Sequence, residues 1–528
     1  MGIATAAARN CWTTMPAKIG AFNPTRLVPL TLRPPFLEFN CGMTGVPRGT
    51  GGGCAPHLQS SRARHMCHQI MEKRSLNSPI ENGSAVVAKA IGVSAYEDGT
   101  VPIRCSGWPP VVALPGHAAL EEDIEADVAV VGAGLAGGSL ALHLAERGIS
   151  VAVLEAGQPG NGASGRNAGH VQPILDTLEP LKAWPGEGRP FLDRFVQHRN
   201  IVFDLCRKHS IDADACNSGM IEAAPKKHAA LERKVERWRP LGYEVNIVVG
   251  DELGRLLGTE AYRYGVHWRE GGRVNPYLFT NGMIDAAVRL GARMFGDSPV
   301  RACERQGRRW RLATPRGSVL AQQIVVCTNG HGGNSFFPSL ARTHYPLVAC
   351  ALATRPLPAS LLETINPSGA ALTQYPSGLY PLVIDGRQRM ITATIPRPGG
   401  AMAAETYFDY FLRYLHRTFP QTRDARIELE SYWTGMTANS SHVLHHDYPK
   451  LYRVAEGVMA LMNLGTWGNV MGPLLGMNVA EAIATERPQD LLLPLEEPRE
   501  VAFPRLFELK TRHVLIPLAR MADRLGLA

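Results

Sequence analysis

The residues with the clearest chemical potential form a glycine-rich turn at positions 132–137, reading Gly-Ala-Gly-Leu-Ala-Gly, and Glu155 lies 18 positions after its last glycine. The glycines allow a tight turn from strand to helix and a close approach of the backbone to a pyrophosphate. N–H groups at the start of the following helix attract phosphates, and Glu155 can accept hydrogen bonds from a ribose diol. This spacing predicts a dinucleotide site, and the acid argues against a 2′-phosphate there.

A second loop of small residues lies beyond Glu155 and Ala156, and it contains Ser164, Arg166 and Asn167. Such a loop would run back along the pyrophosphate toward a flavin ring, which favours FAD over NAD as the dinucleotide. Arg166 could pair with a phosphate or orient a carbonyl at the ring edge. A solvated surface position is the alternative for this arginine.

A third glycine-rich stretch lies near the end of the chain at positions 465–472, and a helix is expected from Leu474 to Thr485 after Pro473. Proline suits the first turn of a helix, because its missing N–H is not needed there. The N-terminus of this helix could face the pyrimidine edge of a flavin, where the helix dipole contributes roughly 0.3–2 kcal/mol. A plain junction between loop and helix is the alternative interpretation.

The elements that would position these motifs alternate as in an α/β chain. The apolar run Val128–Val131 predicts a buried parallel strand, Ser139–Arg147 has helical spacing up to Gly148, and Ser150–Leu154 predicts a second strand. Further helices are expected at Phe191–His209, His228–Leu241 and Tyr277–Leu290, a buried strand at Gln322–Cys327, and several strands within 345–455. The amphipathic segment Val514–Leu527 is expected to pack back on the body or, alternatively, to lie on a membrane surface.

The charge of the 528-residue chain is unevenly distributed. Of the net +8, residues 1–70 carry +6, from seven basic residues and one acid, and the remaining residues carry only +2. A nearly neutral body is not typical of a nucleic-acid-binding surface, so no nucleic-acid partner is predicted. Residues 1–80 show no helical or strand period. They are interpreted as a disordered extension, as sequence upstream of a start at Met66 or Met71, or as an organelle transit peptide.

Two further observations limit the class of protein. No apolar run reaches 18 residues, so no transmembrane segment is predicted. The ten cysteines include no CxxC pair, which argues against a zinc ribbon, and no metal site is predicted. Scattered reduced thiols are expected in a cytoplasmic protein.

Together the three glycine-rich motifs resemble the D-amino-acid-oxidase-like flavoprotein superfamily, and most closely its gamma-glutamylputrescine oxidoreductase-like branch, over residues 105–490. Looser support comes from Asn275-Pro276, Ser298-Pro299-Val300 and positions 325–330. The resemblance implies a mixed α/β fold in which a Rossmann-like FAD-binding domain is interleaved with a substrate domain that has an antiparallel sheet. The FAD domain is expected at 105–172, 275–345 and 456–490, the substrate domain at 173–274 and 346–455, and extensions at 1–100 and 491–528.

The motifs and the resemblance together predict a set of cofactor-binding residues. Val300 would contact adenine through its backbone, and Thr328-Asn329-Gly330 would pass near the cofactor. The complete predicted set is Gly132, Ala133, Gly134, Leu135, Ala136, Gly137, Glu155, Ala156, Ala163, Ser164, Arg166, Asn167, Val300, Thr328, Asn329, Gly330, Gly465, Gly468 and Val470.

Non-covalent FAD is predicted. Relatives that attach FAD through cysteine carry it ahead of the C-terminal motif, and this chain has no cysteine after Cys350. Relatives with a histidyl link carry a histidine about where Asn167 stands, and His170 remains an alternative attachment point. Asn469 stands near the place where the family often carries a histidine.

The resemblance implies hydride removal from a carbon that bears an amine, hydrolysis of the imine by water, and transfer of electrons to O₂ or another acceptor. No catalytic residue is assigned. Four arginines could clamp a substrate carboxylate or lie on the surface: Arg355, Arg387, Arg389 and Arg397. Three histidines are interpreted as polar loop residues: His442, His445 and His446. Two aromatic residues, Tyr432 and Trp433, could line the pocket or pack in the core. The alternatives are a demethylase of the sarcosine or dimethylglycine type, a flavoprotein acting on modified tRNA, and a non-enzymatic FAD-binding module.

Overall fold

The computed structural model describes residues 106–110, 113–331, 336–396, 404–441 and 448–524. All of these residues belong to one compact unit, which includes Ser84–Ala528. The expectations for residues 1–80, for Arg397 and for His442, His445 and His446 lie outside the described residues. Within the described part, no helix is long and apolar enough to cross a membrane.

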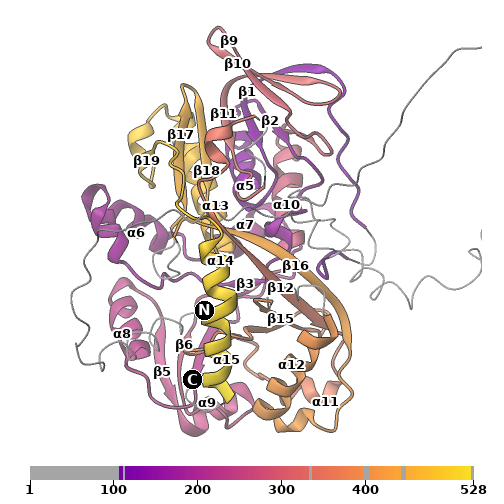
Figure 1. Cartoon of the computed structure of the whole chain (residues 1–528), viewed down its shortest axis with the longest axis vertical. Helices are drawn as coiled ribbons and strands as arrows, with labels where there is room; N and C mark the ends of the chain where they lie inside the picture. Colours follow the sequence, from indigo (N-terminus) through magenta and orange to yellow (C-terminus); the bar gives the residue numbers. More distant parts are fainter. Residues whose placement is uncertain (1–105, 111–112, 332–335, 397–403, 442–447, 525–528) are drawn as a thin grey trace, which may run out of the picture. The chain divides into compact units, whose positions relative to one another are not determined.

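The first sheet has a parallel centre, as the apolar runs in the sequence predict (Figure 1). Strand β1 (Asp123–Val131) pairs in parallel with β2 (Val151–Leu154) on one side and with β11 (Ser318–Val326) on the other. The order is β19-β17-β18-β11-β1-β2-β8, where β8 is Arg293–Phe295, β17 is Lys450–Ala455, β18 is Val458–Met462 and β19 is Leu495–Glu496; the hairpin of β9 (Ala302–Gln306) and β10 (Arg309–Ala313) extends from β11.

Two helices pack tightly beside this sheet because glycines remove the side chains between them. Helix α5 (Leu135–Ala145) is buried along its whole length, and α13 (Gly468–Ala484) lies against it. A Cβ at Gly472 would lie 2.8 Å from the Cβ of Leu135, and one at Gly476 would lie 2.6 Å from the carbonyl oxygen of Ala136. Helix α10 (Pro276–Arg289) contacts α5 as well, and its N-cap Asn275 accepts hydrogen bonds from the N–H groups of Tyr277 and Leu278.

Two helix boundaries predicted from the sequence are wrong. Helix α13 begins at Gly468 and contains Pro473 in its interior, because the close packing of Gly472 on α5 keeps the chain helical ahead of the proline. The helix expected at Phe191–His209 is two helices, α6 (Arg189–Gln197) and α7 (Ile201–His209), separated by a turn. Both bury an apolar face, so the periodicity of the sequence continues across the break.

The second sheet has the order β16-β12-β15-β14-β13-β4-β6-β5. Its pairs are antiparallel, as expected for the substrate domain, except for the parallel pair of β4 and β13. The strands are β4 (Met220–Ala224), β5 (Val245–Val249), β6 (Tyr264–Trp268), β12 (Tyr345–Thr354), β13 (Ala371–Gln374), β14 (Leu382–Ile384), β15 (Met390–Thr394) and β16 (Leu429–Asn439). Helices α8 (Ala229–Trp238), α9 (Gly250–Leu257), α11 (Ala359–Leu362) and α12 (Ala404–Thr418) accompany this sheet (Figure 1).

Both sheets are assembled from separate parts of the sequence, so the chain crosses between them several times. The predicted domain boundaries remain predictions; by its pairing, β17 (Lys450–Ala455) belongs to the first sheet. After β19, the chain forms α14 (Leu506–Lys510), a π-helical turn (Thr511–Leu515) and α15 (Ile516–Arg524). Phe507 and Ala519 of this segment are buried, so the prediction that the C-terminal segment packs back on the body is confirmed.

Candidate active site

The turn between β1 and α5 needs glycine for steric reasons that the structure makes explicit. Gly132 has φ +103°, a conformation that residues with a Cβ rarely adopt, and a Cβ there would lie 2.9 Å from the carbonyl oxygen of Cys327. A Cβ at Gly137 would lie only 1.9 Å from the carbonyl oxygen of Gly132. The turn can therefore bring the N-terminus of α5 against the sheet only with these two glycines in place.

Glu155 lies directly beside this turn. Its carboxylate accepts one hydrogen bond from the N–H of Ala133 at 2.8 Å and another from the N–H of Gly157 at 3.0 Å. Burial raises the pKa of Glu155, and the N–H groups of Ala133 and Gly157 oppose that shift. The acid and the turn are thus close enough to contact one nucleotide. The N–H of Ser298 donates to the carbonyl oxygen of Glu155, which brings the segment leading to the buried Val300 to the same place.

The second loop contacts the start of α5 through Ser164, whose hydroxyl accepts a hydrogen bond from the N–H of Leu135 at 2.9 Å. Gly134 leaves room for this contact, since a Cβ there would lie 2.7 Å from Ser164 Oγ. Arg166 is buried, and it donates to the carbonyl oxygens of Asn161 at 2.8 Å and Thr434 at 3.3 Å. The alternative of a solvated Arg166 is therefore wrong.

Asn167 joins the second loop to the C-terminal glycine-rich motif. Its side-chain N–H₂ donates to Oδ1 of Asn469 at 3.0 Å, and the N–H₂ of Asn469 donates back to Oδ1 of Asn167 at 3.0 Å. Asn469 also donates to the carbonyl oxygen of His170 at 2.8 Å, and Asn167 accepts from the N–H of Gly169 at 2.9 Å. This network holds the N-terminal turn of α13 against the loop.

A cavity of about 510 Å³ lies between these motifs and the second sheet. Nine of the predicted cofactor residues line it: Leu135, Ala163, Ser164, Arg166, Asn167, Asn329, Gly465, Gly468 and Val470. The other predicted residues, from the turn, Glu155 and Ala156, Val300, Thr328 and Gly330, lie outside its lining. The cavity therefore joins the second loop, the residues after β11 and the start of α13, which are far apart in the sequence.

The second sheet and its loops supply the opposite wall. Cys350 of β12, Thr373 of β13 and Thr394 of β15 face the cavity, as do Tyr375 and Ser377. Burial raises the pKa of Cys350 to about 11, so its thiol is protonated near neutral pH. His170 also lines the cavity, and burial lowers its pKa, which keeps its imidazole neutral near pH 7. Among the described residues, no cluster of three His, Cys, Asp or Glu side chains could hold a metal ion.

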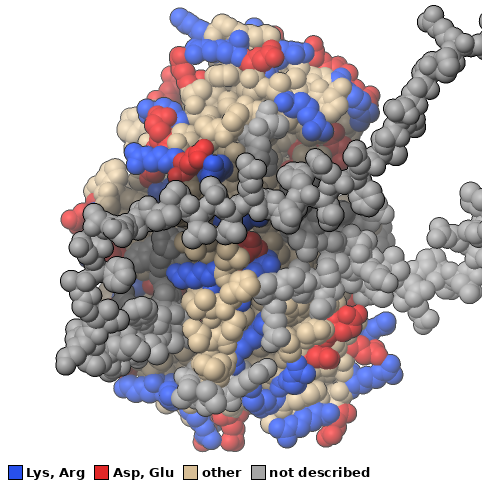
Figure 2. Space-filling view, in the orientation of Figure 1, with Lys and Arg blue, Asp and Glu red and all other residues tan. Residues whose placement is uncertain are grey.

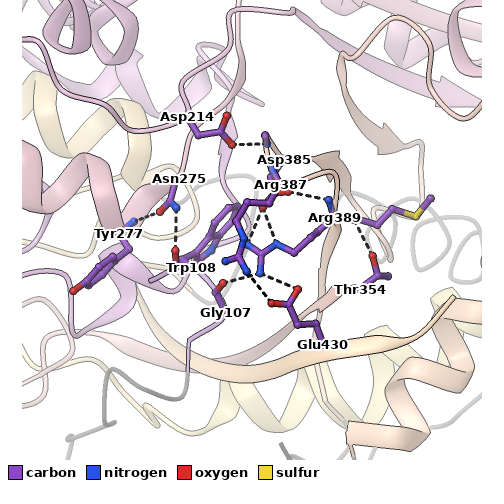
Figure 3. A network of polar contacts seen from close by, with 12 residues as sticks. Gly107, Trp108, Asp214, Asn275, Tyr277, Thr354, Asp385, Arg387, Arg389 and Glu430 are labelled. Atoms are coloured by element: carbon purple, nitrogen blue, oxygen red, sulfur yellow. Dashed lines mark hydrogen bonds and ion pairs between the residues drawn. The ribbon is translucent and has the colours of Figure 1, made fainter. Parts of the chain in front are cut away.

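The arginine candidates for a carboxylate clamp have other partners. Arg389 is fully buried and donates to Asp385 at 2.8 Å and to the carbonyl oxygen of Gly107 at 3.0 Å (Figure 3). Arg387 pairs with Glu430 at 3.0 Å. The exposed Arg355 lies 3.6 Å from Glu428. None of the three lines the cavity, so none is placed to hold a substrate in it.

The two aromatic candidates are core residues. Trp433 is fully buried, and its indole N–H donates to the carbonyl oxygen of Arg166 at 2.8 Å. Tyr432 is buried against Tyr407, with the two rings stacked at 6.1 Å. Neither lines the cavity, which agrees with the core-packing interpretation.

A charged group at another part of the cavity was not predicted from the sequence. Lys234 of α8 lies 2.5 Å from Glu222 and 3.4 Å from Asp176, and all three line the cavity together with Arg233 and Arg237. Burial alone would lower the pKa of Lys234, but the two carboxylates raise it above its usual value. The sequence carried no signal for this group, since basic residues on an amphipathic helix usually form its solvated face.

Comparison with known proteins identifies the family. The family model described as FAD dependent oxidoreductase, DAO, matches residues 127–482, which is most of the described chain. The chain belongs to the DAO family of FAD-dependent oxidoreductases. This confirms the resemblance seen in the three motifs, and it establishes the protein as an FAD-dependent enzyme.

The relatives of this FAD-dependent oxidoreductase include several activities. Gamma-glutamylputrescine oxidoreductase of Escherichia coli (strain K12) is 28% identical over 325 residues, covering 60% of this chain and 74% of the relative. A tRNA 5-methylaminomethyl-2-thiouridine biosynthesis bifunctional protein of Shewanella amazonensis is 30% identical over 208 residues, covering 39% of this chain and 30% of that protein. The crystal structure of glycine oxidase from Geobacillus kaustophilus has a TM-score of 0.57 at 20% identity, covering 72% of this chain and all of that one. This structural match confirms the mixed α/β fold.

Proposed function

We propose that this flavoenzyme oxidises a C–N bond of an amine or amino acid, and that its activity parallels that of gamma-glutamylputrescine oxidoreductase. Bound FAD would supply the hydride acceptor for the carbon that bears the nitrogen. With the nitrogen's proton released to solvent, the substrate becomes an imine, which water would hydrolyse to a carbonyl compound and a free amine. The observation that carries this proposal is the cavity, because it places the second loop and the start of α13 opposite a separate sheet.

The ADP half of FAD would lie at the turn between β1 and α5. Glu155 would accept hydrogen bonds from the ribose diol, and the backbone of Val300 would contact adenine. This placement is supported by the 2.8 Å contact of Glu155 with the N–H of Ala133, and by the link from Glu155 to Ser298. Gly134 has no side chain that would keep a pyrophosphate from the backbone, and Ser164 Oγ lies beside it.

The flavin ring would lie where the second loop meets α13. Ala163, Ser164 and Asn167 come from one side, and Gly465, Gly468 and Val470 from the other. The N-terminus of α13 carries a partial positive charge, which stabilises negative charge at a ring edge. Non-covalent binding is supported by the protonated thiol of Cys350 and by Asn167 standing where a histidyl link would form.

The protein's own contribution is to position the substrate and keep bulk water away from the reacting carbon. The neutral imidazole of His170 lies in the cavity beside Asn469, so it can meet an amine without charge repulsion. An amine that binds unprotonated needs no dedicated base. The described cysteines are all unpaired, which supports a reducing compartment, the cytoplasm.

Spectroscopy of the purified full chain tests this function. We expect a yellow protein whose flavin absorption is bleached anaerobically by gamma-glutamylputrescine or a related amine. Bleaching by sarcosine and dimethylglycine alone would instead assign the demethylase activity. A folded, colourless protein that takes up no added FAD would contradict the proposal.

A further inference from the structure

We propose that the part of the cavity formed by α8 binds a carboxylate at the far end of the amine substrate, with Arg233 and Arg237 as the donors. This inference rests on the proposed function and adds the residues that would hold the remote carboxylate of an elongated amine.

One segment of the chain links two parts of the cavity wall. Ala168, His170, Gln172, Ile174 and Asp176 of this segment line the cavity, and His170–Val171 forms β3. The segment begins next to Asn167, where the flavin ring is proposed, and ends at Asp176, which contacts Lys234 of α8. A molecule as small as glycine would occupy only one part of such a cavity, whereas a long amine could contact both.

Charge decides what the α8 end accepts. Within the described residues it contains three basic side chains, Arg233, Lys234 and Arg237, and two acids, Asp176 and Glu222. Lys234 already lies within ion-pair distance of both acids, and Glu222 also accepts a hydrogen bond from the indole N–H of Trp268 at 3.2 Å. The basic side chains therefore outnumber the acids by one.

The two arginines are the side chains left to hold an anion. Arg233 is exposed and forms no ion pair with another described residue, and the half-buried Arg237 donates to the backbone carbonyl oxygen of Asp176 at 3.2 Å. They are four residues apart on α8, so they lie on one face of the helix. Guanidinium groups match the geometry of a carboxylate through paired N–H donors, which makes a carboxylate the fitting ligand.

The neighbouring contacts hold this end of the cavity in place. The ammonium of Lys234 lies 5.6 Å from the centre of the Tyr375 ring, and His228, the N-cap of α8, packs edge-on against the same ring at 4.7 Å. Since Lys234, Glu222 and Trp268 are already paired, the arginines can engage an incoming carboxylate without breaking a buried ion pair.

A matched pair of amines tests the inference on the FAD-loaded full chain. N-succinylputrescine ends in a carboxylate, and N-butyrylputrescine ends in a methyl group at about the same length. We expect a kcat/KM about tenfold higher for the succinyl compound. The double variant Arg233→Gln/Arg237→Gln should lose this preference through KM, with kcat nearly unchanged. Arg263→Gln is the control, because Arg263 is exposed, pairs with Glu260 and does not line the cavity.

Binding of a non-oxidisable probe separates this inference from the proposed function. Calorimetric titration of the FAD-loaded chain with glutarate should show binding that is absent with glutaramide and weakened about tenfold in the double variant. That result supports the carboxylate site even if neither amine is oxidised. Oxidation of both amines at equal kcat/KM, or no binding of glutarate, would overturn the inference. A preference for spermidine would also overturn it, by assigning this end to Asp176 and Glu222.

Discussion

Asn167 and Asn469 are 302 positions apart in the sequence, yet their side-chain amides exchange two hydrogen bonds of 3.0 Å. Asn167 belongs to the second loop, and Asn469 to the first turn of α13. The pair therefore holds together the two segments between which the flavin ring is proposed to lie. Two asparagines can satisfy each other in this way because each amide offers both a donor and an acceptor.

Replacing Asn469 with alanine should weaken FAD binding. The change removes one hydrogen-bond partner from the half-buried amide of Asn167 and one from the carbonyl of His170, at a cost of about 1 kcal/mol each. We expect the Kd for FAD to rise about tenfold or more, measured by fluorescence titration of the apoprotein. Thr485→Ala, at the exposed end of the same helix, should leave Kd unchanged. Equal Kd values for both variants would contradict the role given to the asparagine pair.

Replacement by alanine should be disruptive at one of two adjacent glycines of α5 and tolerated at the other. In Gly137→Ala the new Cβ would lie 1.9 Å from the carbonyl oxygen of Gly132, so the β1–α5 turn must move. In Gly138→Ala the Cβ meets Ile284 at 3.6 Å, an ordinary contact. We expect Gly137→Ala to lose FAD and lower the Tm by several degrees, and Gly138→Ala to keep both, by absorbance and thermal melting. FAD retained at wild-type affinity in Gly137→Ala would be incompatible with this packing.

Trp108 should support the second loop from the N-terminal side. Its indole N–H donates to the carbonyl oxygen of Asn167 at 2.7 Å. The side-chain amide of Asn275 donates to the backbone carbonyl oxygen of Trp108 at 3.0 Å (Figure 3). Trp108→Phe keeps an aromatic ring but leaves the carbonyl oxygen of Asn167 without the indole N–H. The free energy of unfolding should therefore fall by about 1–3 kcal/mol. The Kd for FAD should rise several-fold.

Trp310→Phe provides the control for this variant. Trp310 also donates its indole N–H to a carbonyl oxygen, that of Glu456 at 3.0 Å, but it lies in the β9–β10 hairpin away from the cavity. Both variants are compared by chemical denaturation and by FAD titration. The Kd for FAD should rise in Trp108→Phe and not in Trp310→Phe. Equal FAD affinity in both would show that Trp108 does not act on the loop.

Cys350 should remain unmodified although it lines the cavity. With its pKa raised to about 11 by burial, only about one thiol in a thousand is ionised at pH 8. Acid precipitation should therefore release all of the flavin into the supernatant. Iodoacetamide at pH 8 should label the partly exposed Cys216 before Cys350, as read by peptide mass spectrometry. Flavin that stays with the precipitate, and is released in Cys350→Ser, would contradict this prediction.

FAD affinity should depend on the ionisation of Glu155. Since burial raises the pKa of this carboxyl, it takes up a proton at a higher pH than an ordinary glutamate, whose pKa is about 4.3. The protonated form accepts hydrogen bonds poorly from Ala133, Gly157 and a ribose diol. The Kd for FAD should thus increase as the pH falls, and the increase should begin at a higher pH than the titration of an ordinary glutamate. Glu155→Gln should bind FAD more weakly near pH 7 and lack this pH dependence.

The composition predicted no nucleic-acid partner, and the charges on the face of the molecule in Figure 2 can be compared with that prediction. Basic and acidic side chains are interspersed over the upper and lower parts of this face, without a continuous basic surface. Exposed basic and acidic side chains also pair with each other, as Arg305 does with Glu456 and Arg316 with Glu121. Exposed pairs of this kind contribute little to stability.

The sequence alone predicted the family and the β1–α5 turn with Glu155 beside it. The β1–α5 turn and Glu155 depend on residues within about 25 positions of one another, so spacing and residue type suffice to predict them. Apolar runs and amphipathic periodicity, which are also local features, predicted the buried parallel strands and the C-terminal segment that packs on the rest of the protein. Prediction from local features failed at Pro473, which lies inside α13 next to the tightly packed Gly472, and at the break between α6 and α7, across which the apolar periodicity continues.

Only the tertiary structure decided which side chains line the cavity. Whether Arg389 clamps a ligand or pairs with Asp385 depends on how its strand sits among its neighbours, and so does whether the basic side of α8 meets solvent or the cavity. Helical periodicity shows which side of α8 is apolar, but it cannot show what the polar side faces. The contact between Asn167 and Asn469 likewise exists only because two segments from opposite ends of the domain are folded together.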